Sequence, residues 1–427
     1  MQATSDLPGE ALRLAEEFPP VSTEAWEAVI KADLAGADYD KKLVWNTEEG
    51  IAVRPYYRAD DVQPRPALLI GAAKPDVLID AARFAENGGT TVQELGYGIG
   101  EGLRKRASGV GSIGFVLSVG SNFFFEIAKL RAARILWAEA TGEPVWIEAR
   151  TSLSNKSIYA PYTNLLRTTT EAMSARIGGA DALQVVAFGF TERLARNVDR
   201  IIAEEAHLND TLDPAAGAYY VEVLTDSIAA EARKLFDATP ESIDQAIAAS
   251  RVAKEKAIAS RRKVMVGVNN YPDIGETLVG DEYPVPSDVW RAAAVFEQIR
   301  LRSDRHAAKT GKRPTVLLLQ RGDLKMRQAR AQFIQNFFGC GGFAIVEADH
   351  LEGSPDLIVL CSSDPEYPAL AQEICPQAKQ PVVVAGNPKD QMDVLNAAGV
   401  AGYVHVLSNA VETLKYWQDK LNIGVEV

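Results

Sequence analysis

Short apolar runs alternate with segments of helical spacing between residues 66 and 272. The runs are nearly all apolar, which is typical of strands buried on both faces, and the segments between them place apolar residues every three or four positions. This alternation predicts a parallel sheet covered by helices, either a doubly wound sheet or a (β/α) barrel. VLIDAARFAE (77–86) is expected to be helical. About five strands are expected, fewer than the eight of a full barrel: PALLIGA, SIGFVLSVG, VWIEART, ALQVVAF and KVMVGVNNY.

A second α/β pattern occupies residues 314–427 and follows a connector at 273–313. The connector contains a long helix whose apolar face includes Trp290, Phe296 and Ile299. The link DHLEGSP, between the second and third strands, is too short for a helical crossover, which needs about ten residues. Five apolar runs predict a flavodoxin-like sheet: TVLLLQ, FAIVEA, DLIVLCSS, PVVVAGN and YVHVL.

Residues 1–60 have the pattern of an arm that precedes the α/β part of the chain. STEAWEAVIKADLAG predicts a helix with Ser22 or Thr23 as its N-cap, and KKLVWNTEEGIAVRPYY predicts two short strands around a turn. Arms of this kind commonly pack on a neighbouring domain or subunit. The expected order is therefore an arm (1–60), a sheet domain (61–272), the connector (273–313) and a second α/β domain (314–427).

Composition excludes several kinds of partner. The 427 residues carry a net charge of −12, which disfavours nucleic acid and anionic membranes because both attract basic surfaces. No apolar run has membrane-spanning length, and the N-terminal residues lack a signal-peptide pattern. The three cysteines are widely spaced in expected core segments, which predicts a reduced, cytoplasmic protein. The four histidines show no metal-binding spacing, so no metal site is expected; His350 is expected to be a solvated loop residue.

The polar stretch RTSLSNKSIYAPY (150–162) directly follows an expected strand. In a barrel it would lie at the carboxyl-terminal mouth, where substrate groups gather. Two interpretations stay open. The side chains of Arg150, Thr151, Ser152, Asn155 and Lys156 either bind an anionic ligand or form a loop hydrogen-bonded within itself.

The helix after this stretch is expected to bury an apolar stripe of Leu166, Thr169 or Thr170, Met173 and Ile177. Arg167 and Glu171, four residues apart, are expected to pair. Gly178 and Gly179 are expected to end the helix. The glycine-rich GYGIGEG (96–102) lies inside another helical pattern, so it indicates close helix packing rather than a phosphate loop.

Several long motifs in one order resemble the adenosylcobalamin-dependent methylmalonyl-CoA mutases, specifically the small (β) subunit of the bacterial heterodimeric enzymes. The resemblance covers nearly the whole chain. It implies an N-terminal arm, a (β/α)8 barrel whose bore holds the CoA chain, and a flavodoxin-like cobalamin-binding domain. The family reaction converts methylmalonyl-CoA to succinyl-CoA. The segments that carry the resemblance include FPPVSTEAWEAVIKADLAGADYDKKLVW, NFFFEIAKLRAARILWAEATGE, KSIYAPYTNLLRTTTEAMSARIGGADAL, ERLARNVDRIIAEEAHL, DPAAGAYYVEVLTDSIAAEARKLF and VGVNNYP.

The sequence departs from the family pattern at the cofactor site. Cobalamin-binding members carry Asp-x-His-x-x-Gly after the first strand of the last domain, and that histidine ligates cobalt. Lys325, Arg327 and Arg330 stand at those three positions here. The resemblance therefore implies that this chain binds no cobalamin and that adenosylcobalamin resides in a partner large subunit.

The catalytic positions of the barrel are changed as well. Ala82 and Arg83 stand where the catalytic subunit has Tyr-His, and Ser112 and Gly114 stand where it has Arg and Ser. No catalytic residue is expected in this chain. The remaining candidates for a vestigial substrate site are Arg150, Thr151, Ser152, Asn155, Tyr162 and Arg167.

The first three barrel strands of the family have no counterpart, because YYRADDVQPRPALLIGAA passes from the arm directly to the expected fourth strand. The expected fold class is therefore α/β, with a partial or degenerate TIM-like barrel followed by a flavodoxin-like domain. The expected function is that of a non-catalytic small subunit that stabilises a mutase heterodimer. The alternative is a stand-alone acyl-CoA-binding or regulatory paralogue without mutase activity.

Overall fold

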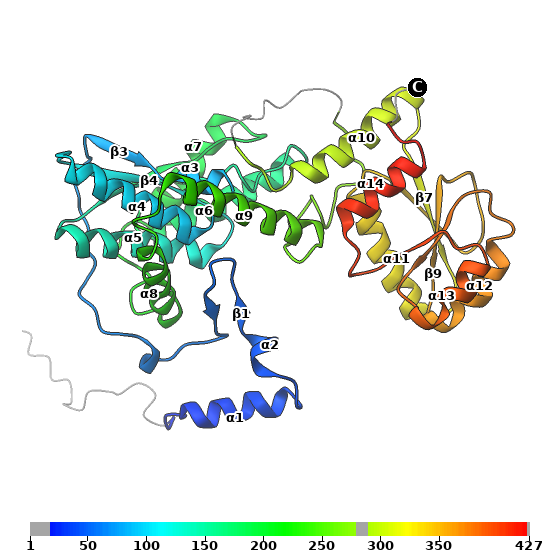
Figure 1. Cartoon of the computed structure of the whole chain (residues 1–427), viewed down its shortest axis with the longest axis horizontal. Coiled ribbons are helices and arrows are strands. Elements are labelled where there is room, and N and C mark those ends of the chain that lie inside the picture. The colour runs from blue at the N-terminus through cyan, green and yellow to red at the C-terminus, as the bar shows by residue number, and fades with distance from the viewer. Residues whose placement is uncertain (1–17, 279–288, 425–427) are drawn as a thin grey trace, which may run out of the picture. The chain divides into compact units, whose positions relative to one another are not determined.

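The computed structural model describes residues 18–278 and 289–424 (Figure 1). The chain divides into two compact units, one ending at Tyr57 and the other beginning at Arg58. No helix in the described ranges is long and apolar enough to cross a membrane.

The first unit contains the predicted helix and hairpin. Helix α1 (Thr23–Asp33) begins at Ser22, whose hydroxyl accepts a hydrogen bond from the Ala25 amide at 3.2 Å. Helix α2 (Tyr39–Leu43) leads to strands β1 (Trp45–Asn46) and β2 (Ala52–Val53), which pair antiparallel. The N-cap at Ser22 and the two short strands are therefore confirmed.

The second unit begins with a four-stranded parallel sheet in the order β3-β4-β5-β6. No closed barrel is formed by the described residues. The sheet follows a short 3-10 turn, η1 (Ala59–Asp61). Its strands are β3 (Val77–Asp80), β4 (Ile113–Val119), β5 (Trp146–Thr151) and β6 (Ala182–Gln184).

Two of the expected strands are wrong. PALLIGA (66–72) pairs with no strand, and KVMVGVNNY (263–271) contributes only an isolated bridge between Val266 and Asn270. The strand lies instead at Val77–Asp80, within the segment expected to be helical, and helix α3 there spans only Ala82–Glu86. Apolar character alone predicted these strands, but a strand also needs a neighbour to pair with, and that neighbour lies elsewhere in the chain.

Helices cover one face of this sheet. Phe115 of β4 packs edge-to-face on Trp137 of α5, with ring centroids 5.2 Å apart. The alternate residues of β5, Trp146, Glu148 and Arg150, lie on the opposite face and are only half-buried. The helices after β3 are α4 (Thr91–Ala107), α5 (Phe123–Thr141), α6 (Pro161–Ile177), α7 (Glu192–Arg200) with η2 (Ile201–Glu205), α8 (Tyr219–Arg233) and α9 (Pro240–Ala259).

The glycines of GYGIGEG permit close packing on helix α4. A Cβ at Gly98 would lie 2.5 Å from the Cβ of Ala81, and one at Gly96 would lie 2.6 Å from the carbonyl oxygen of Ala232. No larger side chain fits at these contacts without displacing its neighbours. The interpretation of this motif as helix packing is confirmed.

The connector contains helix α10 (Ala294–Thr310), in which Phe296 and Ile299 are buried as expected. Trp290, expected on the same helix, precedes it and donates its indole N–H to Glu255 at 2.9 Å. Residues 279–288 of the connector lie outside the described part of the chain. The Tyr159 hydroxyl donates to the Asp304 carboxylate of α10 at 2.8 Å, which ties the connector to the loop after β5.

The last α/β part is a five-stranded parallel sheet in the order β8-β7-β9-β10-β11. In chain order this is 2-1-3-4-5, a common order in doubly wound sheets. As expected, residues 349–356 connect β8 to β9 without a helix. The strands are β7 (Thr315–Gln320), β8 (Ala344–Ala348), β9 (Leu357–Cys361), β10 (Val382–Ala385) and β11 (Gly402–Val404).

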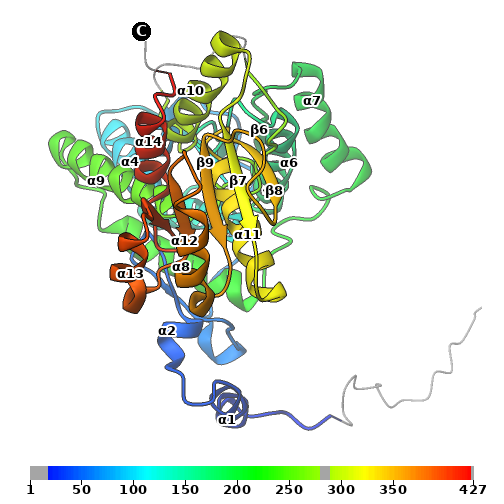
Figure 2. The same ribbon diagram turned by 90° about the vertical axis from the view of Figure 1, so that its right-hand side faces the viewer.

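Helices cover both faces of this second sheet (Figure 2). One face packs on α10, α11 (Leu324–Gly339) and α14 (Ala410–Lys420). The other packs on α12 (Tyr367–Ile374) and α13 (Met392–Ala397), with short 3-10 turns η3 (Asp364–Glu366) and η4 (Lys389–Gln391) leading into them. Cys340 and Cys361 are buried and free, whereas Cys375, expected in the core, is only half-buried.

Candidate functional site

The carboxyl ends of the four parallel strands β3–β6 form one edge of the first sheet, where a barrel enzyme would place its substrate. Arg150, near the end of β5, donates to the Asp80 carboxylate at the end of β3 at 2.8 Å. Thr151 is buried, and its hydroxyl accepts a hydrogen bond from the Val186 amide at 2.8 Å. Arg150 therefore connects β5 to β3 across β4, and Thr151 connects β5 to the residues after β6.

Glu86 of helix α3 connects the end of β4 to the loop after β5. Its carboxylate accepts hydrogen bonds from the hydroxyls of Ser118 and Ser152, each at 2.9 Å, and from the Leu153 amide. Glu86 is 8% exposed. The residue was missed in the sequence, where the only signal was an acidic side chain shortly after an expected strand.

Lys156 and Glu171 form a fully buried ion pair behind this loop. The Lys156 ammonium lies 2.7 Å from each carboxylate oxygen of Glu171, and the Asn155 amide donates to the same carboxylate at 2.7 Å. Burial lowers the pKa of Lys156 and raises that of Glu171, and the mutual attraction opposes both shifts. The polar atoms of Asn155 and Lys156 are thus satisfied within the chain.

The expected Arg167–Glu171 pair is wrong. Arg167 donates to the Asn164 side chain at 2.8 Å and to the carbonyl oxygen of Val266, while Glu171 binds Lys156. Burial lowers the pKa of Arg167. Tyr162, at the start of α6, is 78% exposed, and the structure does not bring it together with the other candidates.

The expected apolar stripe of α6 is only partly present, because Met173 and Ile177 pack against hydrophobic clusters while Leu166 does not. Leu166 is 68% exposed, and Thr169, Thr170, Met173 and Ile177 are not fully buried. The helix instead buries a mostly polar face, in which Asn164, Glu171 and Ser174 make hydrogen bonds. The hydroxyl of Thr168 is buried without a partner among the described residues. Gly178 ends the helix as expected, and Gly179 follows with a φ of 81°. The buried residues of α6 are Asn164, Thr168, Glu171, Ala172, Ser174 and Ala175.

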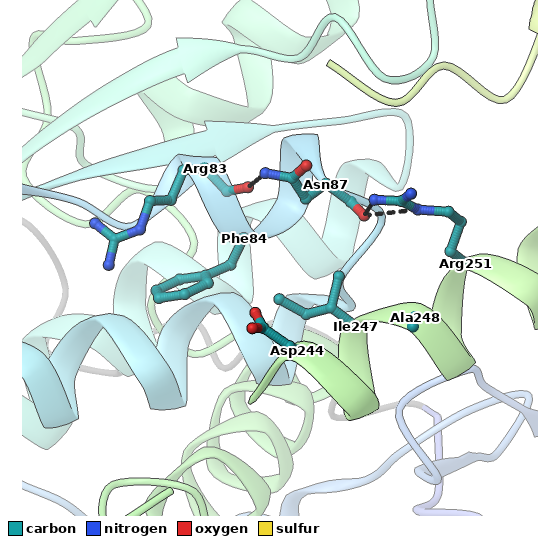
Figure 3. Close-up of a pocket in the computed structure, with 7 residues that line it drawn as sticks. All are labelled: Arg83, Phe84, Asn87, Asp244, Ile247, Ala248 and Arg251. Carbon is teal, nitrogen blue, oxygen red and sulfur yellow. Dashed lines mark hydrogen bonds between the residues drawn. The ribbon is translucent and has the colours of Figure 1, made fainter. Parts of the chain in front are cut away.

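A small hollow of about 320 Å³ lies between α3 and α9 (Figure 3). Arg251 donates twice to the carbonyl oxygen of Asn87, at 2.8 and 3.2 Å, and the Asn87 amide donates to the carbonyl oxygen of Arg83. Arg83 also pairs with Glu101 at 2.5 Å. Sequence analysis missed the hollow because α9 follows α3 by more than 150 residues. The residues that line it are Arg83, Phe84, Asn87, Asp244, Ile247, Ala248 and Arg251.

A family model described as methylmalonyl-CoA mutase matches residues 74–313, more than half of the chain. The chain belongs to the methylmalonyl-CoA mutase family. The match begins just before β3 and ends just before β7, so it contains the whole of the first sheet and its helices.

Relatives within the family are named small subunits. The methylmalonyl-CoA mutase small subunit of Porphyromonas gingivalis is 30% identical over 621 positions, covering 97% of this chain and 99% of the relative. The probable small subunit of Mycobacterium bovis is 34% identical, and the small subunit of Streptomyces virginiae is 31% identical. These two matches cover 64% and 81% of this chain, but only 50% and 64% of the relatives.

The P. gingivalis relative contains a large part that this chain lacks. An alignment of 621 positions can hold no more than the 427 residues of this chain, so at least 194 positions of the relative have no counterpart.

The positions at which the resemblance places the family's catalytic residues are closely packed in the structure. Ala82 is fully buried at the start of α3, and Arg83 makes the contacts described above. A Cβ at Gly114 would lie 2.8 Å from both the Pro75 side chain and the carbonyl oxygen of Trp146. No serine fits at position 114 unless these neighbours move.

The residues after β7 do not fit the cobalt ligation of the family's cobalamin-binding members. Arg327, which the resemblance places at the histidine position, lies on α11, and a guanidinium has no lone pair to offer a metal. Arg330, on the same helix, pairs with Asp364 at 3.1 Å. His350 follows β8, and its ring lies 2.7 Å from the Asp349 carboxylate in an exposed loop. No cluster of metal-ligating side chains occurs in the ranges 18–278 and 289–424.

Glu366 connects the segments that follow β7 and β9 at the carboxyl edge of the second sheet. Its carboxylate accepts hydrogen bonds from the hydroxyls of Ser362 and Ser363, at 2.7 and 2.5 Å, and from the Asp323 amide. These bonds, led by those from Ser363 and Ser362, lower the pKa of Glu366 to about 2. In doubly wound sheets ligands bind beside such an edge. Here the Glu366 carboxylate already accepts the hydrogen bonds that the groups at this edge could donate to a ligand.

Proposed function

We propose that this chain is the non-catalytic small subunit of a heterodimeric methylmalonyl-CoA mutase. The large subunit would carry adenosylcobalamin and convert methylmalonyl-CoA to succinyl-CoA, while this chain stabilises the complex in the cytoplasm. The observation that carries the proposal is the self-satisfied carboxyl edge of the first sheet. The Lys156–Glu171 pair is fully buried, and Arg150 is bound to Asp80.

A catalytic edge needs acids, bases or anion-binding groups that are free to meet a substrate. Here Glu86 and Glu171, two buried carboxylates near the strand ends, each bind several donors of the same chain. Removing any of these donors for a substrate would leave a buried charge unpaired, which costs several kcal/mol. The vestigial candidates therefore serve the fold of the loop in this proposal.

The C-terminal part would be a flavodoxin-like domain that has lost its cofactor. Support comes from the strand order 2-1-3-4-5 and from Arg327 at the position of the cobalt ligand. Glu366 adds to this, because its carboxylate takes up donors that a ligand at the β7–β9 edge would use. The chemistry would then belong to the cofactor of the large subunit, and this chain would supply binding surface.

The first sheet would be a partial TIM-like barrel. Its four parallel strands and covering helices support this description, and the at least 194 unmatched positions of the P. gingivalis relative leave room for further strands in that relative.

Copurification with a mutase large subunit tests the proposal. The tagged chain is expressed with a cobalamin-bearing large subunit, purified, and weighed by native mass spectrometry. We expect one complex that contains both chains, with cobalamin in an amount equal to the large subunit. A chain that never copurifies, yet binds CoA by itself, would support the stand-alone alternative instead.

A further inference from the structure

The first sheet has two free edges. Strand β3 pairs only with β4, and β6 pairs only with β5, so the outer sides of β3 and β6 have no strand partner in residues 18–278 and 289–424. Every open sheet has two such edges, whose unpaired backbone groups can pair with another chain, but a parallel sheet is normally covered on both faces.

The face of the sheet opposite the helices also carries polar side chains without hydrogen-bond partners among the described residues. The side chain of Glu148 makes no hydrogen bond or ion pair with any described residue, although it is only half-exposed. The indole N–H of Trp146, two residues earlier on the same face, is buried without an acceptor in the described chain. A buried donor of this kind normally has a partner, which indicates that something further covers this face.

We propose that a second copy of this chain covers it. Strand β6 of each copy pairs in parallel with β3 of the other, and the two four-stranded sheets close into one eight-stranded barrel. A two-fold axis along the barrel keeps all eight strands parallel and makes the two new junctions identical.

Strand number decides between a second copy and the large subunit as the occupant. A closed barrel has no free edge to offer, and the family's catalytic chain is expected to hold all eight strands itself. A second copy, in contrast, lacks the same strands and presents the same two edges. The closed barrel would also bring Glu148 and Trp146 of one copy toward the interior-facing side chains of the other.

The mass of the chain alone tests the inference. We expect the purified chain to have twice its mass of 46.3 kDa by light scattering after gel filtration at micromolar concentration. A single species of 46.3 kDa at every concentration overturns the inference. The dimer must also survive in the absence of any large subunit.

A cysteine cross-link tests the pairing itself. Leu78 and Asp80 of β3 share a face with Gly114 and Val116 of β4, and Gln184 of β6 shares a face with Arg150. Adjacent strands lie about 4.8 Å apart, within the Cα separation that a disulfide spans. Either Leu78→Cys or Asp80→Cys, combined with Gln184→Cys, should give a dimer on oxidation that reduction reverses.

The matched control combines Gln184→Cys with Glu241→Cys, on an exposed position of α9. Equal cross-linking in the control and in both β3 pairs would contradict the pairing. A chain that is monomeric alone but copurifies with the large subunit overturns this inference and leaves the proposed function standing. A dimer that ignores the large subunit supports this inference and contradicts the proposed function.

Discussion

The ammonium of Lys156 lies 2.7 Å from both carboxylate oxygens of Glu171, and neither side chain is exposed to solvent. The pair joins the loop after β5 to the middle of helix α6. Because the pair is completely buried, neither charge can reach a ligand, which favours a structural role for this loop over a ligand-binding one.

Lys156→Met should destabilise the chain by about 3–5 kcal/mol, because it leaves the Glu171 carboxylate buried without its cation. Urea unfolding followed by circular dichroism measures the change. The double variant Lys156→Met/Glu171→Met is the control and should regain much of the loss. Unchanged stability in the single variant, with loss of CoA binding, would show a ligand site instead.

The hydrogen bonds to Glu366 predict a pH dependence. Its pKa is lowered to about 2 in the folded chain, below the ordinary value of 4.5, so its stabilising contribution is present above about pH 4.5 and is lost as the pH falls toward 2. Glu366→Gln should therefore lower Tm at pH 6, and the difference from the unmodified chain should shrink toward pH 2.5. A difference that stays constant with pH would show that ionisation of Glu366 does not matter.

Gly98→Ala should destabilise the chain although alanine favours helices more than glycine does. The added Cβ would lie 2.5 Å from that of Ala81, and overpacking of this kind costs about 1–3 kcal/mol. Lys105→Ala, on the exposed side of α4, is the control and should change Tm little. Thermal unfolding of both variants measures the contrast, and a more stable Gly98→Ala variant would contradict the packing.

The unmodified chain should take up no cobalamin, and Arg327→His should not restore uptake. An imidazole at position 327 would replace only one group, while Arg330 stays bound to Asp364 and Glu366 still holds the donors between β7 and β9. Absorbance of the desalted protein after incubation with cobalamin measures retention. Stoichiometric retention by Arg327→His would show that the histidine alone was missing.

Local patterns predicted the elements that depend on local chemistry. Ser22 caps α1, the glycines of α4 pack closely, and residues 349–356 connect two strands without a helix. In each case the signal lies in a few consecutive residues: a cap residue, a run of small residues inside a helix, or a link too short for a helix.

The errors occurred where distant partners determine the outcome. PALLIGA has the composition of a strand but no neighbour to pair with. Helix α6 buries Glu171 and exposes Leu166, because Lys156 and Asn155 provide partners that no helical pattern reveals.

The candidate site was predictable only in part. Arg150, Thr151, Ser152 and Asn155 do lie together at the carboxyl edge, since they follow one strand directly. Their partners Asp80 and Glu86 come from an earlier strand and helix, so only the fold reveals that these polar groups are already bound.

An isomerisation assay tests the central claim most directly. Succinyl-CoA formed from methylmalonyl-CoA is measured with adenosylcobalamin for this chain alone, for a mutase large subunit alone, and for both together. We expect no product from this chain alone, and a higher and more lasting rate from the pair than from the large subunit by itself. Turnover by this chain alone, abolished by a change at Arg150 or Glu171, would contradict the account.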